Sequence, residues 1–301
     1  MIGAYVQLAR PAQWVKNLAV FAGPAFGMRL FDAAGFPQAL LAFAGFCVVS
    51  SASYAINDAI DRKADARHPT KKNRPVARGA ISPVAALVFG GLLAIGGVGL
   101  SAALLPRATT LLLAVYFVLI LCYSLTLKNR VLLDVIVIAI GFVLRAWAGA
   151  AAVEVFVSPW LIICTFMICM FMGFGKRRCE LAVLGNAEEA HQHRKTLLHY
   201  TPELLNHLIS VTAGIAIITF VLYTMIKGDH PPPFAKQNLL YTLPLVVYGV
   251  FRYAMLTESG KLTGPTEILL KDRPFLATVV LWSLIAAGVV YEGQIRGWLD
   301  W

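Results

Sequence analysis

The sequence predicts an all-α, polytopic membrane protein, because of its apolar composition, the length of its apolar segments and the placement of its charges. Of 301 residues, 58% are hydrophobic and 14% charged, whereas a soluble domain of this size carries about a quarter charged residues. Apolar stretches of about 18 or more residues recur along the whole length, each long enough to cross a bilayer as a helix. A soluble α/β domain is excluded because its buried strands run only about 4–8 residues.

We expect about nine transmembrane helices that form a single domain over residues 1–301. The start of the sequence, MIGAYVQLARPAQW, lacks the basic and apolar regions of a cleavable signal. Polar residues (Trp14, Lys16 and Asn17) lie within or beside the first expected span. The expected spans are 12–28, 38–57, 83–103, 108–126, 131–151, 158–175, 205–226, 237–255 and 275–292.

The basic residues predict the orientation in the membrane. Of the 26 lysines and arginines, 19 lie at the N-terminus or in the loops after the second, fourth, sixth and eighth spans, and five lie on the other side. Short loops rich in Lys and Arg stay in the cytoplasm. We therefore expect a cytoplasmic N-terminus and an external C-terminus. Nucleic-acid binding is not expected, because no soluble basic module with interleaved aromatic residues is present.

Three aspartates follow the second span at positions i, i+3 and i+7, namely Asp58, Asp61 and Asp65. If the helix continues to His68, before Pro69, the three carboxylates fall within an arc of about 60°. Like charges so close repel one another unless a cation joins them. Carboxylate oxygens in this number suit Mg²⁺, which typically binds through a few carboxylates and substrate phosphates. A solvated helix end with ordinary ion pairs is the alternative, but it does not explain the unmixed acidic stripe.

Basic residues after the aspartates, including Lys71 and Arg74, are candidates to contact the anion that the metal brings. Arg145 lies within a span, on the same predicted helix face as Asp134, and intramembrane ionisable residues usually face the interior and serve function. We expect Arg145 to contact a phosphate or the aspartates.

Two further groups lie at the cytoplasmic ends of spans. Tyr123 and Lys128 close the fourth span, where an interfacial tyrosine with a snorkelling lysine is the alternative to a substrate contact. Lys176, Arg177 and Glu180 lie within one helical turn after the sixth span, where they form either part of the site or a helix-end ion pair. The five cysteines have no metal-ligand spacing, and no nucleophilic triad is present.

The run Asn57-Asp58-x-x-Asp61-x-x-x-Asp65 resembles the signature of the UbiA superfamily of intramembrane prenyltransferases. The expected span count, the orientation and the position of the motif after the second helix agree with this resemblance over essentially the whole chain. It implies a nine-helix, UbiA-like bundle in the cytoplasmic (inner) membrane. It also implies that the aspartates hold Mg²⁺ and a diphosphate, with Asn57 belonging to the motif.

Other segments resemble one branch of that superfamily, the decaprenyl-phosphate phosphoribosyltransferases. The chain lacks the Arg-Thr pair, the RPL and the second Asp-rich motif that are typical of quinone-pathway members. The segments that carry the resemblance are RPAQWVKN, which contains Lys16 and Asn17, HPTKKNRPVARG, YSLTLKN, LDVIVIAIGFVLRAWAGA, GKRRCELAVLGNAEEAHQHRKT and EILLKDRP.

This branch implies transfer of 5-phosphoribose from phosphoribosyl pyrophosphate (PRPP) to a polyprenyl phosphate, with release of pyrophosphate. The product supplies an arabinose donor for cell-wall glycans such as arabinogalactan. A donor with a diphosphate and a 5-phosphate needs many cationic contacts, and the cytoplasmic rim offers Lys16, Arg74, Lys128, Lys176, Arg177 and Arg273.

Two other function classes remain open at this point. A UbiA-type enzyme could instead move a prenyl group from a prenyl diphosphate to an aromatic acceptor, as in quinone or haem O synthesis. A non-enzymatic transporter is the more remote alternative, because transporters often carry charges near the midplane whereas here they gather at one rim.

Overall fold

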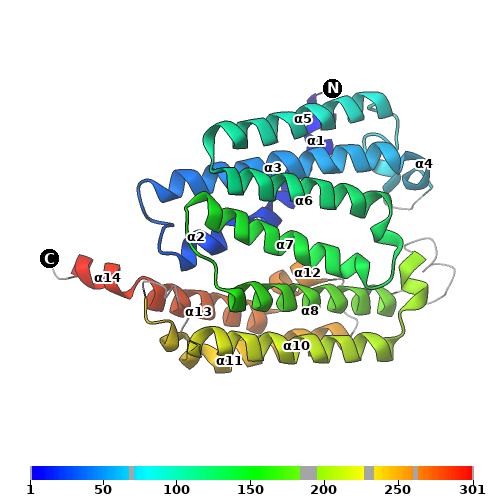
Figure 1. Cartoon of the computed structure of the whole chain (residues 1–301). Coiled ribbons are helices and arrows are strands. Elements are labelled where there is room, and N and C mark those ends of the chain that lie inside the picture. The colour runs from blue at the N-terminus through cyan, green and yellow to red at the C-terminus, as the bar shows by residue number, and fades with distance from the viewer. Residues whose placement is uncertain (1, 68–70, 184–194, 227–233, 260–263, 300–301) are drawn as a thin grey trace. The chain divides into compact units, whose positions relative to one another are not determined.

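The structure is a computed structural model that describes residues 2–67, 71–183, 195–226, 234–259 and 264–299. Helices of the α and 3-10 type make up all its regular elements, and no β-strand occurs in these ranges (Figure 1). The expected all-α fold is confirmed.

Within the described ranges, eight helices are long and apolar enough to cross a membrane, judged by length and composition. Each coincides with one of the predicted spans from the second to the ninth. They are α3 (Gly35–Ile60), α5 (Pro83–Leu104), α6 (Arg107–Leu125), α7 (Leu133–Ala152), α8 (Pro159–Val183), α10 (Pro202–Met225), η5 (Lys236–Thr242) joined to α11 (Leu243–Glu258), and α13 (Arg273–Val290).

The first predicted span differs from the structure. Helix α1 (Ile2–Ala9) ends at Arg10, whose backbone is left-handed with φ 53°. A 3-10 helix, η1 (Pro11–Phe21), and a short α-helix, α2 (Ala22–Phe26), then occupy the range predicted as one span. Pro11 fits this break because its ring fixes φ and it has no N–H to continue the preceding helix.

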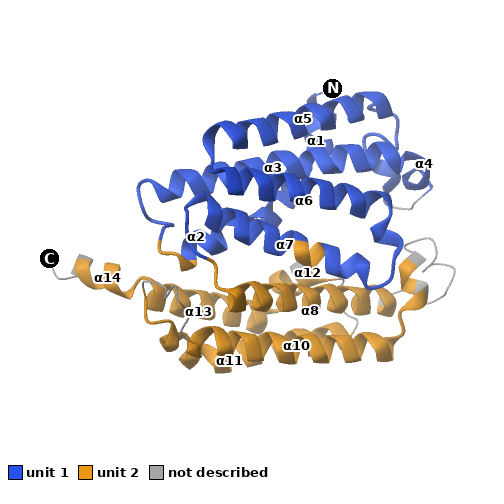
Figure 2. Ribbon diagram, viewed as in Figure 1, with its two compact units in different colours: residues 1–25, 29–137, 141–156 blue, residues 26–28, 138–140, 157–301 orange. Residues whose placement is uncertain are grey.

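The shorter elements are α4 (Arg62–Asp65), η2 (Lys71–Asn73), η3 (Leu127–Asn129), η4 (Lys195–His199), α12 (Pro265–Lys271) and α14 (Glu292–Leu299). Contacts divide the chain into two compact units (Figure 2). Unit 1 comprises residues 1–25, 29–137 and 141–156, and unit 2 comprises residues 26–28, 138–140 and 157–301. The expectation of a single domain over residues 1–301 stays a prediction.

In unit 1, α3 packs against α1, η1, α5 and α6. Small residues allow the close approach of α5 to α3: a Cβ at Gly90 would lie 2.8 Å from Ile56 Cγ1, and one at Gly97 would lie 2.8 Å from Val49 Cγ2. Small residues of this kind are typical of helix contacts in membranes. These close contacts hold α3, whose C-terminal turn carries Asp58, tightly against α5.

In unit 2, α8 packs along α10 and α11, and α13 packs against α11. The Tyr253 hydroxyl donates to the Met172 carbonyl over 3.0 Å, which joins α11 to α8. Arg252 of α11 forms a two-bonded ion pair with Asp272, at 2.7 and 2.8 Å, and Asp272 also caps α13 by accepting from the Phe275 N–H at 2.8 Å.

Candidate active site

The three aspartates lie where α3 gives way to α4 in unit 1. Asp58 belongs to the last turn of α3, Asp65 ends α4, and Asp61 stands between the two helices with φ −83° and ψ 4°. The predicted continuous helix is therefore broken at Asp61, although the Asp65 N–H still donates to the Asp61 carbonyl at 2.8 Å. Asp58 and Asp65 are buried, whereas the Asp61 side chain is 26% exposed.

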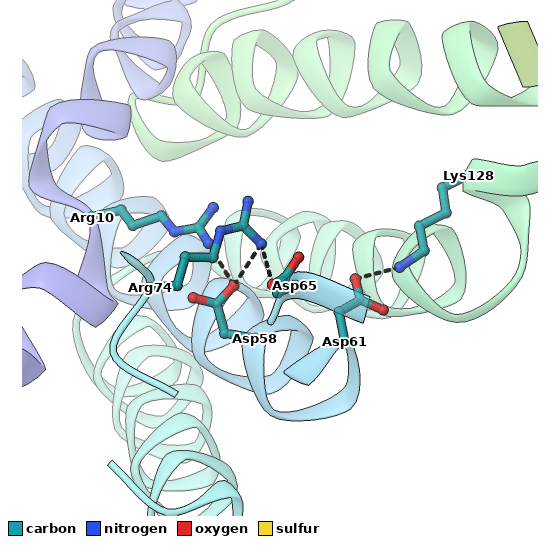
Figure 3. A network of polar contacts seen from close by, with 6 residues as sticks. All are labelled: Arg10, Asp58, Asp61, Asp65, Arg74 and Lys128. Carbon is teal, nitrogen blue, oxygen red and sulfur yellow. Dashed lines mark hydrogen bonds and ion pairs between the residues drawn. The ribbon is translucent and has the colours of Figure 1, made fainter. Parts of the chain in front are cut away.

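Each of these carboxylates is paired with a cation from another part of unit 1 (Figure 3). Arg74 Nη1 reaches Asp65 Oδ2 at 2.6 Å and Asp58 Oδ1 at 3.2 Å, so it bridges two aspartates. Lys128 of η3 donates to Asp61 Oδ2 at 2.6 Å. The three aspartates therefore face cations on two different sides. Asp61, at the break between α3 and α4, points toward Lys128, whereas Asp58 and Asp65 face Arg74.

Arg10 is a site residue that was not predicted from the sequence. Its Nη2 lies 2.5 Å from Asp58 Oδ1, and its guanidinium lies 4.9 Å from the centre of the Tyr54 ring. The left-handed backbone at Arg10, a rare conformation for a residue other than glycine, is not readable from composition. Arg10 and Asp58 also lie 48 residues apart in the sequence, so no local spacing pattern predicts their contact.

Lys71, a predicted anion contact, lies in η2 and is half-buried. Burial, and next the like charge of Arg74, lower the pKa of the Lys71 ammonium, against the opposing pull of Asp65 and Asp61.

The donor chemistry of the aspartates fits a hard divalent cation. Asp58 is 1% exposed, and its Oδ2 has no hydrogen-bond partner among the described residues, so one buried carboxylate oxygen is available as a ligand. Such an atom is costly to bury unsatisfied. No three His, Cys, Asp or Glu side chains of the described ranges are gathered into a ready metal-binding group; Asp61 pairs with Lys128, whereas Asp58 and Asp65 share Arg74.

Arg145 and Asn17, both predicted site residues, meet in a buried polar network of unit 1. Arg145 Nε donates to Asn17 Oδ1 at 2.8 Å, and its Nη2 donates to the Tyr116 hydroxyl at 2.6 Å. The Gly141 carbonyl accepts from Nη1 at 3.0 Å, and the Ser50 hydroxyl donates to Asn17 Oδ1 at 3.3 Å. No carboxylate among the described residues forms an ion pair with Arg145, so the expected direct contact with the aspartates is not present.

Lys176, Arg177 and Glu180 lie together at the end of α8 in unit 2. Arg177 is buried and forms an ion pair with Glu180, and Lys176 Nζ lies 3.8 Å from Glu180 Oε1. The helix-end ion pair considered from the sequence is thus present, and the assignment of these three to the substrate site stays a prediction.

The remaining predicted residues differ in their surroundings. Lys16 is exposed on η1, and Tyr123 is half-buried near the end of α6. Asn57 is half-buried in α3, and its carbonyl accepts the Asp61 N–H at 2.9 Å, the ordinary helical bond that closes the last turn of α3. Residues 184–194, part of the loop that lacks a second Asp-rich motif, fall outside the described ranges.

The long apolar helices and the aspartates at the junction of α3 and α4 agree with the intramembrane transferase fold that the sequence resemblance implied. The chain belongs to the UbiA prenyltransferase family, whose model matches residues 18–263. The predicted family is confirmed, and with its eight apolar helices the chain is a multi-pass membrane protein.

The chain is also similar to individual members of this family and to a solved structure. The chain is 30% identical to decaprenyl-phosphate phosphoribosyltransferase of Mycolicibacterium smegmatis over 97% of this chain and 93% of that relative. It is also 34% identical to protoheme IX farnesyltransferase of Azoarcus sp. over 97% of this chain and 94% of that relative. Among solved structures, a UbiA homolog from Archaeoglobus fulgidus bound to GPP and Mg²⁺ shares the fold, with a TM-score of 0.74, 20% identity, and coverage of 95% of this chain and 98% of that one.

Proposed function

We propose that the protein transfers 5-phosphoribose from PRPP to a polyprenyl phosphate such as decaprenyl phosphate and releases pyrophosphate. One observation carries the proposal: the similarity to decaprenyl-phosphate phosphoribosyltransferase extends over nearly the full length of both chains. The cationic surroundings of the aspartates support it, since PRPP carries a diphosphate and a separate 5-phosphate.

In this reaction Asp58, Asp61 and Asp65 would hold Mg²⁺, which when bound would supply neutralisation of the charge that develops on the leaving pyrophosphate, a stabilisation that is often the largest catalytic term. Lys71, Arg74 and Lys128 contact the diphosphate, and Arg is suited to this because its planar fork can bind two phosphate oxygens at once. These residues hold the anomeric carbon of the ribose in line with the incoming lipid phosphate.

The acceptor phosphate is an anion at neutral pH, so it attacks the anomeric carbon with inversion and without a strong general base. The C1–O bond to pyrophosphate breaks as the bond to the lipid phosphate oxygen forms. We propose that Lys16, Lys176 and Arg177 serve the donor's 5-phosphate. The other proposed substrate-binding residues are Asn17, Asn57, Tyr123, Arg145 and Glu180.

The cellular setting is proposed on the same basis. We propose that the N-terminus and the site rim face the cytoplasm, where PRPP is available, and that the protein resides in the inner membrane; the partition of basic residues supports this orientation. The lipid product would feed synthesis of an arabinose donor for cell-wall glycans such as arabinogalactan.

A second candidate is the transfer of a prenyl group from a prenyl diphosphate to an aromatic acceptor. The 34% identity to protoheme IX farnesyltransferase favours it, and the metal and diphosphate would use the same aspartates. The two candidates differ in the donor, and a comparison of donors separates them.

The test is an assay of the purified protein with radiolabelled PRPP and a polyprenyl phosphate, beside one with a prenyl diphosphate and 4-hydroxybenzoate or haem. We expect label from PRPP in the lipid phase and no prenylated aromatic product. Turnover of the prenyl diphosphate with no use of PRPP would establish the second candidate instead.

A further inference from the structure

We infer that Arg10 belongs to a counter-ion set, Arg10, Arg74 and Lys128, that exchanges between the aspartates and the donor's diphosphate, so that metal and diphosphate bind together and poorly alone. The inference rests on the proposed function only in that the donor carries a diphosphate. It assigns Arg10 a binding role that the aspartate motif itself does not reveal.

Geometry is the first support. The three cations and three carboxylates of Figure 3 are joined by contacts of 2.5 to 3.2 Å, and all six residues belong to unit 1. Asp58 Oδ1 accepts from both arginines, whereas the buried Oδ2 has no partner among the described residues. A metal that binds to Asp58 therefore finds one oxygen ready and the other held by two guanidinium groups.

Charge balance is the second support. The three carboxylates and the three cations paired with them sum to zero, and Lys71 lies beside them as a further basic residue, so a divalent cation that enters alone adds two positive charges that no anion compensates. Buried unpaired charge is strongly unfavourable. A diphosphate that enters with the metal brings about three negative charges, and the cations released from the aspartates then have a new anionic partner. The bound metal therefore raises the affinity of the site for the diphosphate, and by thermodynamic linkage the diphosphate raises its affinity for the metal by the same factor.

The position of Arg10 is the third support. Its left-handed backbone turns the chain between α1 and η1, and the guanidinium lies against the Tyr54 ring while it reaches Asp58. The side chain is 23% exposed although its partner is 1% exposed, so the guanidinium lies at the solvent-facing edge of a buried carboxylate. From there it can leave Asp58 for a phosphate that approaches from the solvent without crossing the protein interior.

The test measures binding to the purified full-length protein without turnover. Mn²⁺ binding is followed by electron paramagnetic resonance in the absence of phosphate, and pyrophosphate binding is followed by calorimetry at saturating Mg²⁺. In Arg10→Gln we expect Mn²⁺ alone to bind more tightly, because a competing cation is gone. Pyrophosphate should bind about tenfold more weakly or worse, which corresponds to the loss of a hydrogen bond between charged groups.

Two controls accompany this variant. Arg29→Gln removes an arginine whose exposed pair with Asp32, at 2.7 Å, lies outside the site, and it should leave both affinities unchanged. Arg10→Lys keeps the charge without the planar fork, so Mn²⁺ alone should bind as in the wild type while pyrophosphate binds less tightly. It also keeps the proposal testable if Arg10→Gln fails to fold.

Opposite changes in the two affinities support the exchange. Unchanged or weaker Mn²⁺ binding in Arg10→Gln overturns it, as does unchanged pyrophosphate binding. Because both candidate donors carry a diphosphate, these outcomes do not depend on which donor the enzyme uses. If the wild type consumes PRPP but neither affinity changes in Arg10→Gln, the exchange fails and the proposed function stands. If the two affinities change in opposite directions but the wild type does not use PRPP, the exchange stands and the proposed function fails.

Discussion

At the residue scale, the site is organised by pairing of opposite charges. The Asp58 carboxylate accepts from Arg10 and Arg74, and Asp61 accepts from Lys128. In a protein without a bound cation, these pairs offset the repulsion among the three carboxylates. The same carboxylates provide the hard oxygen ligands that Mg²⁺ prefers.

We predict that Asp58→Asn and Asp61→Asn each abolish the Mg²⁺- or Mn²⁺-dependent activity and leave the protein folded, since the amide keeps the shape but not the charge of the ligand. Initial rates at varied Mg²⁺, together with size-exclusion profiles, provide the measurement. Asp32→Asn, an exposed carboxylate outside the site, is the matched control. Full activity of both variants, or of the wild type in EDTA, would contradict the metal assignment.

The sequence singled out the three aspartates, with Arg74 and Lys128 as candidate contacts to the substrate, but it predicted neither their ion pairs with the aspartates nor the role of Arg10. Asp58, Asp61 and Asp65 were recognisable because their spacing places unmixed negative charge on one helical face. Arg74 and Lys128 were recognisable as cations beside the motif or at a span end. Arg10 was counted among the basic residues of the N-terminus and begins the segment RPAQWVKN, but no role was assigned to it. Its role depends on a left-handed backbone and on a contact 48 residues away, neither of which has a local sequence pattern.

At the element scale, small residues decide how closely helices approach. Gly149 of α7 faces η1, and a Cβ there would lie only 1.7 Å from the Val20 carbonyl oxygen. The main chain of η1 therefore rests directly on α7. This contact explains why residues 11–26 need not form the continuous span that their hydrophobicity predicted: side-chain hydrophobicity carries no information about a backbone-to-backbone contact.

We predict that Gly149→Ala destabilises the protein by at least the 1–3 kcal/mol typical of overpacking, because the obstructing atom belongs to the backbone. Thermal unfolding in detergent measures the effect. The control is Gly99→Ala on α5, where a Cβ would meet nothing within 4 Å and the helical preference for alanine should leave stability equal or slightly raised. Equal unfolding temperatures for the two variants would contradict the packing of η1 on α7.

Three of the long helices begin with a capping side chain. Ser82 caps α5 by accepting from the Ala85 N–H at 3.1 Å, Thr201 caps α10 by accepting from the Leu204 N–H at 3.2 Å, and Asp272 caps α13. A proline follows each cap within two residues, the arrangement expected at a helix N-terminus.

The charge of Asp272 also makes the stability of the folded protein depend on pH. The hydrogen bonds from Arg252 lower the pKa of the Asp272 carboxyl below its usual value of about 3.9. Since the folded-state pKa is depressed, the stabilisation is fully present above about pH 4 and is lost as the pH falls through the folded-state pKa.

We predict that Asp272→Asn, which keeps a capping oxygen but not the charge, unfolds at a lower temperature than the wild type at pH 6. The difference should shrink as the pH is lowered below about 4. Asp272→Ala, which also removes the cap, should be less stable than Asp272→Asn at every pH. A difference between wild type and Asp272→Asn that does not change with pH would exclude the charged pair as its cause.

At the scale of the whole molecule, the apolar spans were predictable because a membrane helix must satisfy its backbone hydrogen bonds internally over about 20 residues. Eight of the predicted spans appear as long helices, and the first does not. The predicted orientation rests on the 19-to-5 partition of basic residues between the two expected sides.

We predict that Lys72→Cys, on an exposed residue after the aspartate motif, is labelled by a membrane-impermeant thiol reagent only from the cytoplasmic side. Gln237→Cys, exposed at the start of η5, should be labelled only from the outside. A background without the five natural cysteines avoids labelling of the exposed Cys122. Intact cells and inverted vesicles provide the two accessibilities, and labelling of both positions from one side would break the predicted topology.

The central claim is that the anomeric carbon of PRPP becomes bonded to a lipid phosphate. The most direct measurement uses PRPP labelled with ¹⁴C in the ribose and, separately, with ³²P in the β-phosphate, each incubated with the wild type, Mg²⁺ and a polyprenyl phosphate. The account predicts ¹⁴C in the organic phase and ³²P in the aqueous phase as pyrophosphate, in equal amounts, with neither transfer in Asp58→Asn. Retention of both labels in the aqueous phase as intact PRPP, under conditions where the same preparation transfers a prenyl group from a prenyl diphosphate, would contradict it.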